Sequence, residues 1–230
     1  MYRSLAYASI FALVAGAAAP AALTSPAEAE DLDPDEGAVR FALTAAPHTH
    51  AIDLGDETLT VEGYAYNGQT PGPTLRAALG QSITVELSNE LDEPTTIHWH
   101  GVDVPFEMDG VTWQMDPVDP GETFTYTFTP PRAGTFWYHP HFNSDEQVSG
   151  GLYGVLVVED PAEPSADVEL VAVIDDWSPS GADLGDEHLE PEGPWTVNGL
   201  VFPALTVQGG QRVRARLLNA AGAGYVHLQW

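Results

Sequence analysis

Residues 134–141 read Gly134-Thr135-Phe136-Trp137-Tyr138-His139-Pro140-His141, and this stretch indicates the fold most clearly. β-Branched and aromatic residues are typical of strands, and glycine and proline bound this run. Successive side chains of a strand point to opposite faces, so residues two apart project the same way, about 6–7 Å from each other. The stretch therefore predicts a β-strand whose end presents His139 and His141 together.

A second pair of this kind lies upstream, in Thr95-Thr96-Ile97-His98-Trp99-His100. Two such pairs on neighbouring strands can direct four imidazoles at one metal centre. Neutral imidazole suits copper, zinc, iron and nickel, whereas the chain contains no cysteine, which excludes a blue-copper or Cys-ligated zinc site within it. We predict four metal ligands: His98, His100, His139 and His141.

Other residues of the same types are predicted to have ordinary roles. His48 and His50 form a third pair, but they lie in a polar lead-in without an apolar strand pattern, so we expect them to be solvated bystanders. His188 and His227 fit no ligand pattern. Met108 and Met115 are too scattered among aspartate and proline to indicate a thioether copper site. The aromatic residues that we expect to pack around the ligands are Trp99, Trp137, Tyr138 and Phe142.

The whole chain is predicted to be all-β. Short segments of period two recur, bounded by glycine, proline and asparagine, and no long helical period follows the N-terminal leader. Before residue 160 the expected strands are 58–66, 74–77, 82–89, 95–100, 123–129, 134–139 and 154–159. That number of strands suits one Greek-key β-sandwich, occupying residues 30–160.

A second β pattern follows a proline-containing linker at residues 161–167. Its expected strands are 168–174, 195–197, 204–207, 212–218 and 225–229. Only 63 residues follow Asp167, too few strands to close a sandwich, which would leave an apolar face exposed. We therefore expect residues 168–230 to be a truncated second domain and the chain to be the N-terminal part of a longer protein.

The first 29 residues have the pattern of a signal peptide. Arg3 precedes an apolar run from Leu5 to Leu23, and Ala27-Glu28-Ala29 offers a cleavage motif. This predicts export, hence a periplasmic or secreted protein, and the lack of an Arg-Arg pair favours the general secretory route. The apolar run is also long enough to act as an uncleaved membrane anchor, which is the alternative.

The composition is strongly acidic, with 34 Asp and Glu against 7 Lys and Arg and a formal net charge of −27. Such a surface repels nucleic acid and anionic membranes and attracts cations. Because the acidic residues are scattered, they are typical of a halophile-type solvated surface. With no cysteine there are no disulfides, so stability must come from packing.

Several motifs of this sequence resemble those of the multicopper oxidases. The resemblance to the first domain of that family rests on Thr96-Ile97-His98-Trp99-His100-Gly101, Met108-Asp109-Gly110, Asp119-Pro120-Gly121, the run from Gly134 to His141, Gly151-Leu152-Tyr153-Gly154, and the opening segment from Tyr66 to Pro73. Val197-Asn198-Gly199 and the segment from Arg216 to Ala220 resemble the start of the second domain. The resemblance covers nearly all of residues 38–230.

This resemblance implies cupredoxin-like sandwiches and a trinuclear copper cluster between the first and last domains. It assigns His98 to type 2 copper and His100, His139 and His141 to the type 3 pair. Asp109 matches an acidic position near the cluster that helps deliver protons to reduced oxygen. An ordinary role for Asp109 in an Asp-Gly turn is the alternative.

The chain departs from the family in one large respect. A run of three spaced histidines and a His-Cys-His segment, which supplies the type 1 ligands, are both absent from it. The leading hypothesis is thus the N-terminal part of an exported, laccase-like oxidase that couples one-electron oxidation of a phenol, aromatic amine or metal ion to four-electron reduction of dioxygen to water, the chain alone being inactive.

Two alternatives stay open. One is a non-catalytic periplasmic copper-binding protein of cupredoxin fold, complete as it stands. The other is a two-domain oxidase whose cluster forms between subunits, although the lack of a ligand cluster after residue 217 fits the copper-free middle domain of the three-domain type better.

Overall fold

A computed structural model describes residues 21–32, 37–177, 193–201, 203–222 and 226–228. These residues group into two compact units. The first, which we call the sandwich unit, comprises residues 26–49 and 62–165. The second unit comprises residues 1–25, 50–61 and 166–230. Each unit is described by itself.

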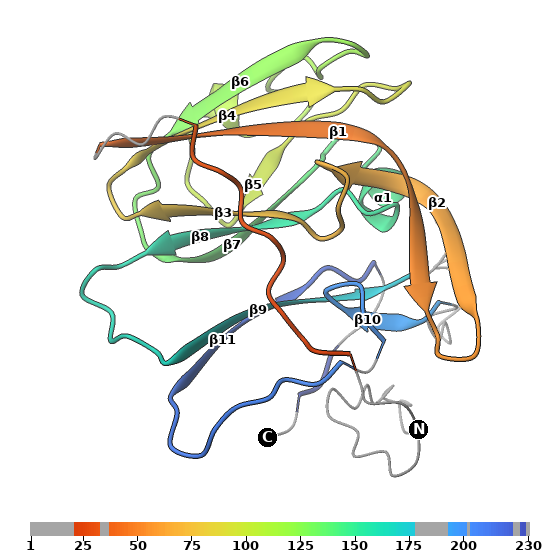
Figure 1. The fold of residues 1–230 in the computed structure, drawn as a ribbon. Coiled ribbons are helices and arrows are strands. Elements are labelled where there is room, and N and C mark those ends of the chain that lie inside the picture. Colours follow the sequence, from red (N-terminus) through yellow and green to blue (C-terminus); the bar gives the residue numbers. More distant parts are fainter. Residues whose placement is uncertain (1–20, 33–36, 178–192, 202, 223–225, 229–230) are drawn as a thin grey trace, which may run out of the picture. The chain divides into compact units, whose positions relative to one another are not determined.

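The strands of the sandwich unit form two four-stranded sheets; the ends of two of these strands, residues 50–53 and 58–61, count toward the second unit. One has the order β2-β1-β4-β6, with β2 at Thr58–Tyr66, β1 at Ala38–Asp53, β4 at Ser82–Asn89 and β6 at Thr123–Phe128. The other has the order β3-β8-β7-β5, with β3 at Gly72–Ala78, β8 at Gly154–Glu159, β7 at Gly134–His139 and β5 at His98–His100. Figure 1 shows β1, β4 and β6 in one layer and β3, β8 and β7 in another.

Strand pairing in the sandwich unit is mixed. β1 pairs with β4 and β3 pairs with β8 in parallel, while β4–β6, β5–β7 and β7–β8 are antiparallel. Parallel neighbours require connections that cross between the sheets, as in a Greek key. This arrangement brings β5 and β7 side by side although they lie far apart in the sequence.

The core of the sandwich unit consists of the inward-facing side chains of both sheets. They include Phe41, Leu43, Ile83, Val85, Leu87, Tyr126, Leu75, Trp99, Tyr138 and Leu156, all at most 2% exposed. Complete burial of one such side chain stabilises the fold by about 1.5–3 kcal/mol. A continuous apolar core therefore fixes which side chains of β5 and β7 point inward.

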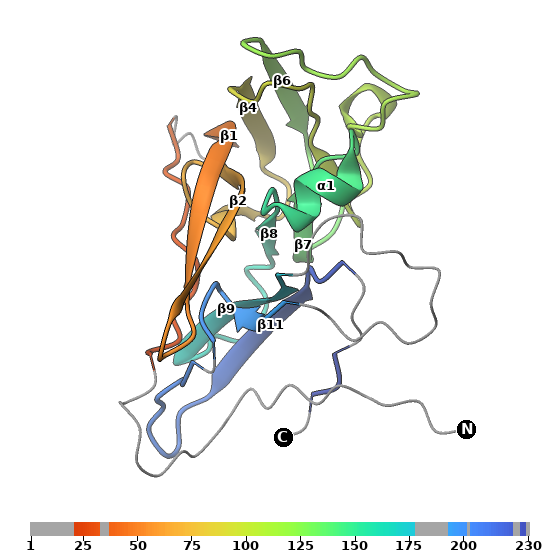
Figure 2. The ribbon, with the colours of Figure 1, turned by 90° about the vertical axis from the view of Figure 1, so that its right-hand side faces the viewer.

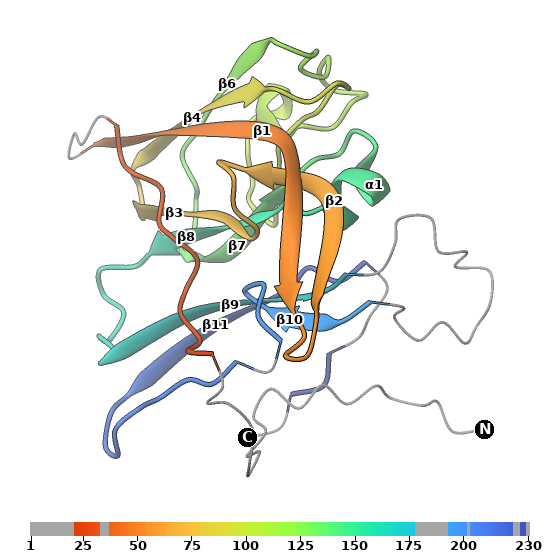
Figure 3. The ribbon, with the colours of Figure 1, turned by 45° about the vertical axis from the view of Figure 1, so that its right-hand side comes forward.

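The second unit contains a three-stranded sheet of order β10-β9-β11 (Figure 3). The central strand β9 spans Val168–Asp176, and it pairs antiparallel with β10 at Trp195–Val197 and parallel with β11 at Val213–Asn219. One cluster of its buried residues comprises Leu23, Leu170, Ala172, Ile174 and Val197.

In the part of the chain that the structure describes, helical structure is limited to short connections. The 3-10 helix η1 covers Phe106–Met108, and α1 covers Ser144–Ser149 in the connection from β7 to β8 (Figure 2). Among the described residues, no helix is both long and apolar enough to cross a membrane.

The all-β prediction is confirmed, and the bounds of β2, β4, β7, β8 and β10 match the predicted ranges. The strand predicted at 204–207 is wrong, since only Ala204 forms an isolated bridge there. β5 is shorter than predicted. Tyr225 and Gln229 lie outside the described residues, and residues 226–228 form no strand.

Strand β1 was not predicted from the sequence. Its first half alternates buried Phe41, Leu43 and Ala45 with more exposed residues, but its second half is polar and contains Pro47. Proline cannot donate to a ladder and lowers the strand signal. Backbone pairing with β4 holds the first half, from Ala38 to Ala45, and β2 is the other neighbour of β1 in the sheet.

Candidate metal centre

The register between β5 and β7 brings the two histidine pairs together. His98 lies opposite His139, Trp99 opposite Tyr138, and His100 opposite Trp137. Trp99 and Tyr138 point into the core and are fully buried. By strand alternation, His98, His100, Trp137 and His139 occupy the other face of the same sheet.

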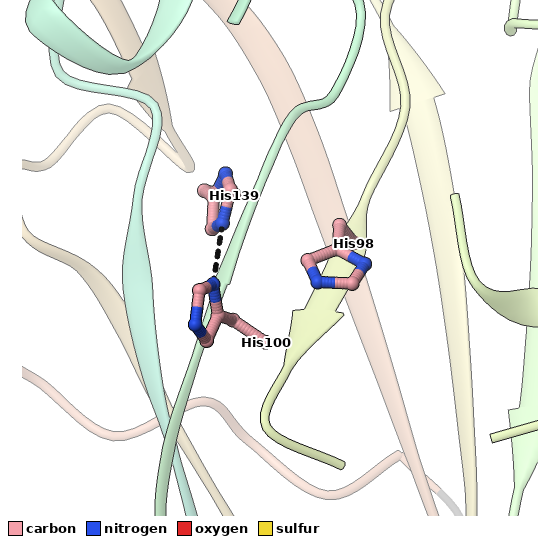
Figure 4. A group of neighbouring side chains, drawn as sticks. All are labelled: His98, His100 and His139. Atoms are coloured by element: carbon pink, nitrogen blue, oxygen red, sulfur yellow. Dashed lines mark hydrogen bonds between the residues drawn. The ribbon is translucent and has the colours of Figure 1, made fainter. Parts of the chain in front are cut away.

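Three of these side chains form a compact group of ligand atoms. One ring nitrogen from each of His98, His100 and His139 lies within 4.8 Å of the others (Figure 4). Nδ1 of His100 and Nε2 of His139 are 3.3 Å apart. With metal–nitrogen bonds of about 2.0–2.1 Å, two imidazoles on one tetrahedral ion place their nitrogens about 3.3–3.4 Å apart. The spacing of this pair therefore fits a shared metal ion.

Backbone carbonyls hold two of the rings by their other nitrogen. Nδ1 of His98 lies 2.8 Å from the carbonyl oxygen of Asp109, and Nδ1 of His139 lies 3.0 Å from that of Pro140. A carbonyl only accepts, so each Nδ1 carries the proton and donates it. In the neutral ring this leaves Nε2 with its lone pair, as metal ligation requires.

Burial favours the neutral form of the His100, His139 and His141 rings. It lowers the pKa of His139 to about 3, because the charged ring would lose its hydration. Burial, and secondly the neighbouring His98, also lower the pKa of His100 and that of His141. At neutral pH all three rings are unprotonated at one nitrogen and can bind a metal.

Asp109 lies beside the group of three histidines, next to His98. Its Oδ1 is 3.2 Å from His98 Nδ1, farther than its own carbonyl oxygen, so the carbonyl is the principal acceptor and the carboxylate a weaker second one. The carboxylate also acts electrostatically on His141 and opposes the lowering of the pKa of that ring. Its side chain is 26% exposed and can exchange protons with solvent.

Gly110 allows Asp109 to reach His98. Gly110 has φ +72°, and a Cβ there would lie 2.0 Å from the carbonyl oxygen of Ile97. Only glycine combines this backbone conformation with so close an approach. The Asp-Gly turn therefore has a positioning role next to the cluster as well as a turn role.

His141 lies beyond the paired part of β7. Its ring centroid is 4.2 Å from that of His98, and its ring is more exposed than that of His139. The structure thus brings His141 to the site, although it is not one of the three histidines whose ligand atoms group within 4.8 Å.

The predicted aromatic surroundings divide between the two faces of the sheet. Trp137 stacks on His139 with ring centroids 3.9 Å apart, directly against the ligands. Trp99 and Tyr138 belong to the core behind the strands. Phe142 is partly buried. Met108, at the end of η1, and Met115, in the loop after it, pack against the core, as structural methionines do.

The prediction that His48 and His50 lie solvated in a polar lead-in without a strand pattern is wrong for the strand and for the burial of His50, while their exclusion from the metal site stays a prediction. Both lie in β1, and His50 is only 6% exposed, with its ring centroid 4.5 Å from that of Trp177. Strand alternation gives this pair the same spacing, but neither residue belongs to the three-histidine group. His227 is exposed, and His188 lies outside the described residues.

Two buried polar residues near the site are not predicted from the sequence. Gln147 is fully buried in α1, and Thr96 is fully buried just before β5. Gln147 stands in a polar segment that reads as a surface loop, so composition gives no sign of its burial. Thr96 was noticed only as part of a strand.

Comparisons with known proteins identify relatives of this chain. A sequence profile described as multicopper oxidase matches residues 49–163. The multicopper oxidase MmcO of Mycobacterium tuberculosis is 34% identical over 257 residues, covering 93% of this chain and 50% of that protein. The chain thus spans about half the length of this relative.

Solved structures give the same result. A multi-copper oxidase from Pseudomonas thermotolerans is 40% identical, with a TM-score of 0.69 over 79% of this chain and 46% of that one. A multicopper oxidase from Campylobacter jejuni, described as a metallo-oxidase, is 28% identical, with a TM-score of 0.70 over 86% of this chain and 43% of that one.

Proposed function

Because the chain belongs to the multicopper oxidase family, we propose that it supplies the oxygen-reducing half of a complete oxidase. That oxidase couples one-electron oxidation of a reducing substrate to four-electron reduction of dioxygen to water. The observation that carries the proposal is the convergence of His98, His100 and His139, whose ligand atoms lie within 4.8 Å of one another.

The donor set fits copper. All three donors are imidazoles, and backbone carbonyls orient Nε2 of His98 and His139. Copper bound here would supply electrons to dioxygen. We assign His98 to a type 2 ion and His100, His139 and His141 to a type 3 pair, with the remaining ligands in the part of the oxidase beyond this chain.

Asp109 is proposed to hold and deliver protons. Reduction of dioxygen to water consumes protons, and a carboxylate next to the site can transfer them from solvent. Asp109 is partly exposed and lies 3.2 Å from a ligand ring, so it connects the two. Its backbone carbonyl independently orients His98.

The reducing substrate is proposed to be a phenol, an aromatic amine or a metal ion. The acidic surface, with net charge −27, favours a cationic substrate by raising its local concentration. One structural relative is described as a metallo-oxidase. We also propose export to the periplasm or the medium, based on the N-terminal leader pattern.

Oxygen uptake by the complete, copper-loaded oxidase tests this function. We expect uptake that depends on the reducing substrate and is abolished by His139→Ala. Asp109→Asn keeps the backbone carbonyl, so copper binding should survive while turnover falls. A protein that binds copper but consumes no oxygen with any of the three substrate classes would instead support the non-catalytic alternative, which the relatives do not favour.

A further inference from the structure

The side chain of Gln147 joins the two segments that carry the histidines. Its Nε2 donates to Glu93 Oε1 at 3.0 Å and to the carbonyl oxygen of Pro94 at 2.9 Å. Its Oε1 accepts from Thr95 Oγ1 at 2.7 Å. The side chain is fully buried, and both donor hydrogens and its oxygen are engaged. Gln147 therefore fixes α1 to residues 93–95.

Two further bonds run between the same segments. Asn143 Nδ2 donates to Glu93 Oε2 at 3.1 Å, and the backbone N–H of His141 donates to Thr96 Oγ1 at 2.9 Å. Asn143 is the N-terminal cap position of α1, yet its side chain makes no capping bond. Its amide serves the connection to Glu93 instead, as well as a bond to Glu146.

These bonds begin where the strand ladder stops. The pairing of β5 with β7 ends at His98 and His139, so no ladder bond holds His141. Residue 95 lies three positions before His98, and residue 143 lies two positions after His141. At His141, the hydrogen bonds between residues 93–96 and residues 141–147 replace the backbone bonds of the ladder.

We propose that Gln147 is a positioning residue that, together with Thr96, holds His141 against His98. Without it the other three histidines keep their places, because the β5–β7 ladder and the carbonyls of Asp109 and Pro140 hold them. The inference rests on the proposed function for its purpose, but the placement of His141 can be measured without any metal.

The test uses the metal-free 230-residue chain labelled at histidine, with NMR cross-relaxation between rings as the readout. Wild type should show a cross peak between His98 and His141, whose centroids are 4.2 Å apart, and another between His98 and His139, at 5.4 Å. In Gln147→Leu we expect the first to disappear and the second to remain. Asp145→Asn, at an exposed site on the same helix, is the matched control and should change neither.

Thr96 provides a second, isosteric test if Gln147→Leu fails to fold. Thr96→Val removes the acceptor of the His141 N–H and should also remove only the His98–His141 peak, whereas Thr96→Ser keeps the hydroxyl and should retain it. Loss of both peaks in a folded variant, or loss of neither, would overturn the proposal. Copper titration of the same variants is separate: affinity should fall about 10–100-fold, as for other residues that orient metal ligands.

Residues 21–32 run through both units: residues 21–25 belong to the second unit and residues 26–32 to the sandwich unit. In the second unit, the N–H of Leu23 donates to Ala204 O at 2.8 Å, and Leu23 is 5% exposed in the core. Ser25 Oγ accepts from the backbone N–H of Val171 at 3.0 Å. In the sandwich unit, the N–H of Ala29 donates to Thr74 O at 3.0 Å, and Glu28 pairs with Arg76 at 2.6 Å. Cleavage after Ala29 would remove all of these contacts.

We infer that residues 23–32 are retained in the mature protein and that any leader ends upstream of Leu23. Ala17, Ala18 and Ala19 provide small residues for cleavage there. The intact mass of the protein recovered from the producing cells tests this. An N-terminus at or before Leu23, an uncleaved chain included, agrees with the inference. An N-terminus at Thr24 or later, such as Glu30, would contradict it.

Discussion

Two His-x-His pairs of this chain lie in strands, yet only one of them belongs to the group of three histidines that could hold a metal ion. His98 and His100 in β5 face the end of β7 and join His139. His48 and His50 in β1 have the same spacing, but His50 is buried against Trp177. Spacing places two imidazoles on one face of a strand, while the neighbouring strand decides whether they find further ligands. A metal site is thus a property of register as much as of motif.

The largest expected effect is on copper affinity. His139→Ala removes one of the two nitrogens that lie 3.3 Å apart, so Cu(II) affinity of the chain should fall by about 100-fold or more, beyond the effect of residues that only orient ligands. His48→Ala is the matched control from the other pair and should leave affinity unchanged. Calorimetric titration measures both, and equal losses in the two variants would remove the distinction between the pairs.

Gly110→Ala should disturb the cluster through the backbone. The added Cβ would lie 2.0 Å from Ile97 O at φ +72°, so we expect the free energy of unfolding to fall by about 3 kcal/mol or more, with weaker copper binding because His98 loses its acceptor. Gly121→Ala has a similar φ of +79° with no atom within 4 Å, and should cost about 1 kcal/mol. Urea unfolding compares the two, and similar losses would mean that the close approach to Ile97 is unimportant.

His50→Ala should affect stability and leave metal binding intact. Loss of the buried ring and its contact with Trp177 is expected to lower the free energy of unfolding by about 1–3 kcal/mol. Copper affinity should equal that of wild type. A clear loss of affinity would assign the second pair a part in metal binding and contradict the comparison.

Met108→Leu should have the smallest effect. Met108 packs on the core, and Leu has a similar volume, so stability should change by less than about 1.5 kcal/mol. Titration with Cu(I), the ion that thioethers prefer, should give the wild-type affinity. Weaker Cu(I) binding would show that this sulfur is a ligand after all.

Much of the sandwich could be predicted because its strands carry strong local signals. β4 alternates cleanly, β7 is rich in aromatic residues, and glycine or proline lies next to β7 and β8. β1 escaped prediction because its second half is polar and contains Pro47, and its pairing with β4 is a long-range contact that no local pattern records. Ala204 has strand-like neighbours but only a single bridge.

Some features of the site could likewise be predicted from the sequence, and others could not. The spacing predicts four histidine ligands, of which the structure groups the ligand atoms of His98, His100 and His139, and the role of Asp109 stays a prediction from its resemblance to a family position. The carbonyls that set the tautomers of His98 and His139 could not, because every residue has a carbonyl and only the fold directs one at a ring. Gln147 was hidden for a related reason: its burial follows from tertiary packing of a six-residue helix whose composition is polar.

Pulsed EPR of the chain loaded with one equivalent of Cu(II) tests the central claim most directly, since it resolves the nitrogen couplings of coordinated imidazoles. The β5–β7 site predicts couplings from more than one imidazole that are weakened or lost in His98→Ala and His139→Ala and unchanged in His48→Ala. A wild-type spectrum without imidazole couplings, or one that these three substitutions leave equally unchanged, would contradict it.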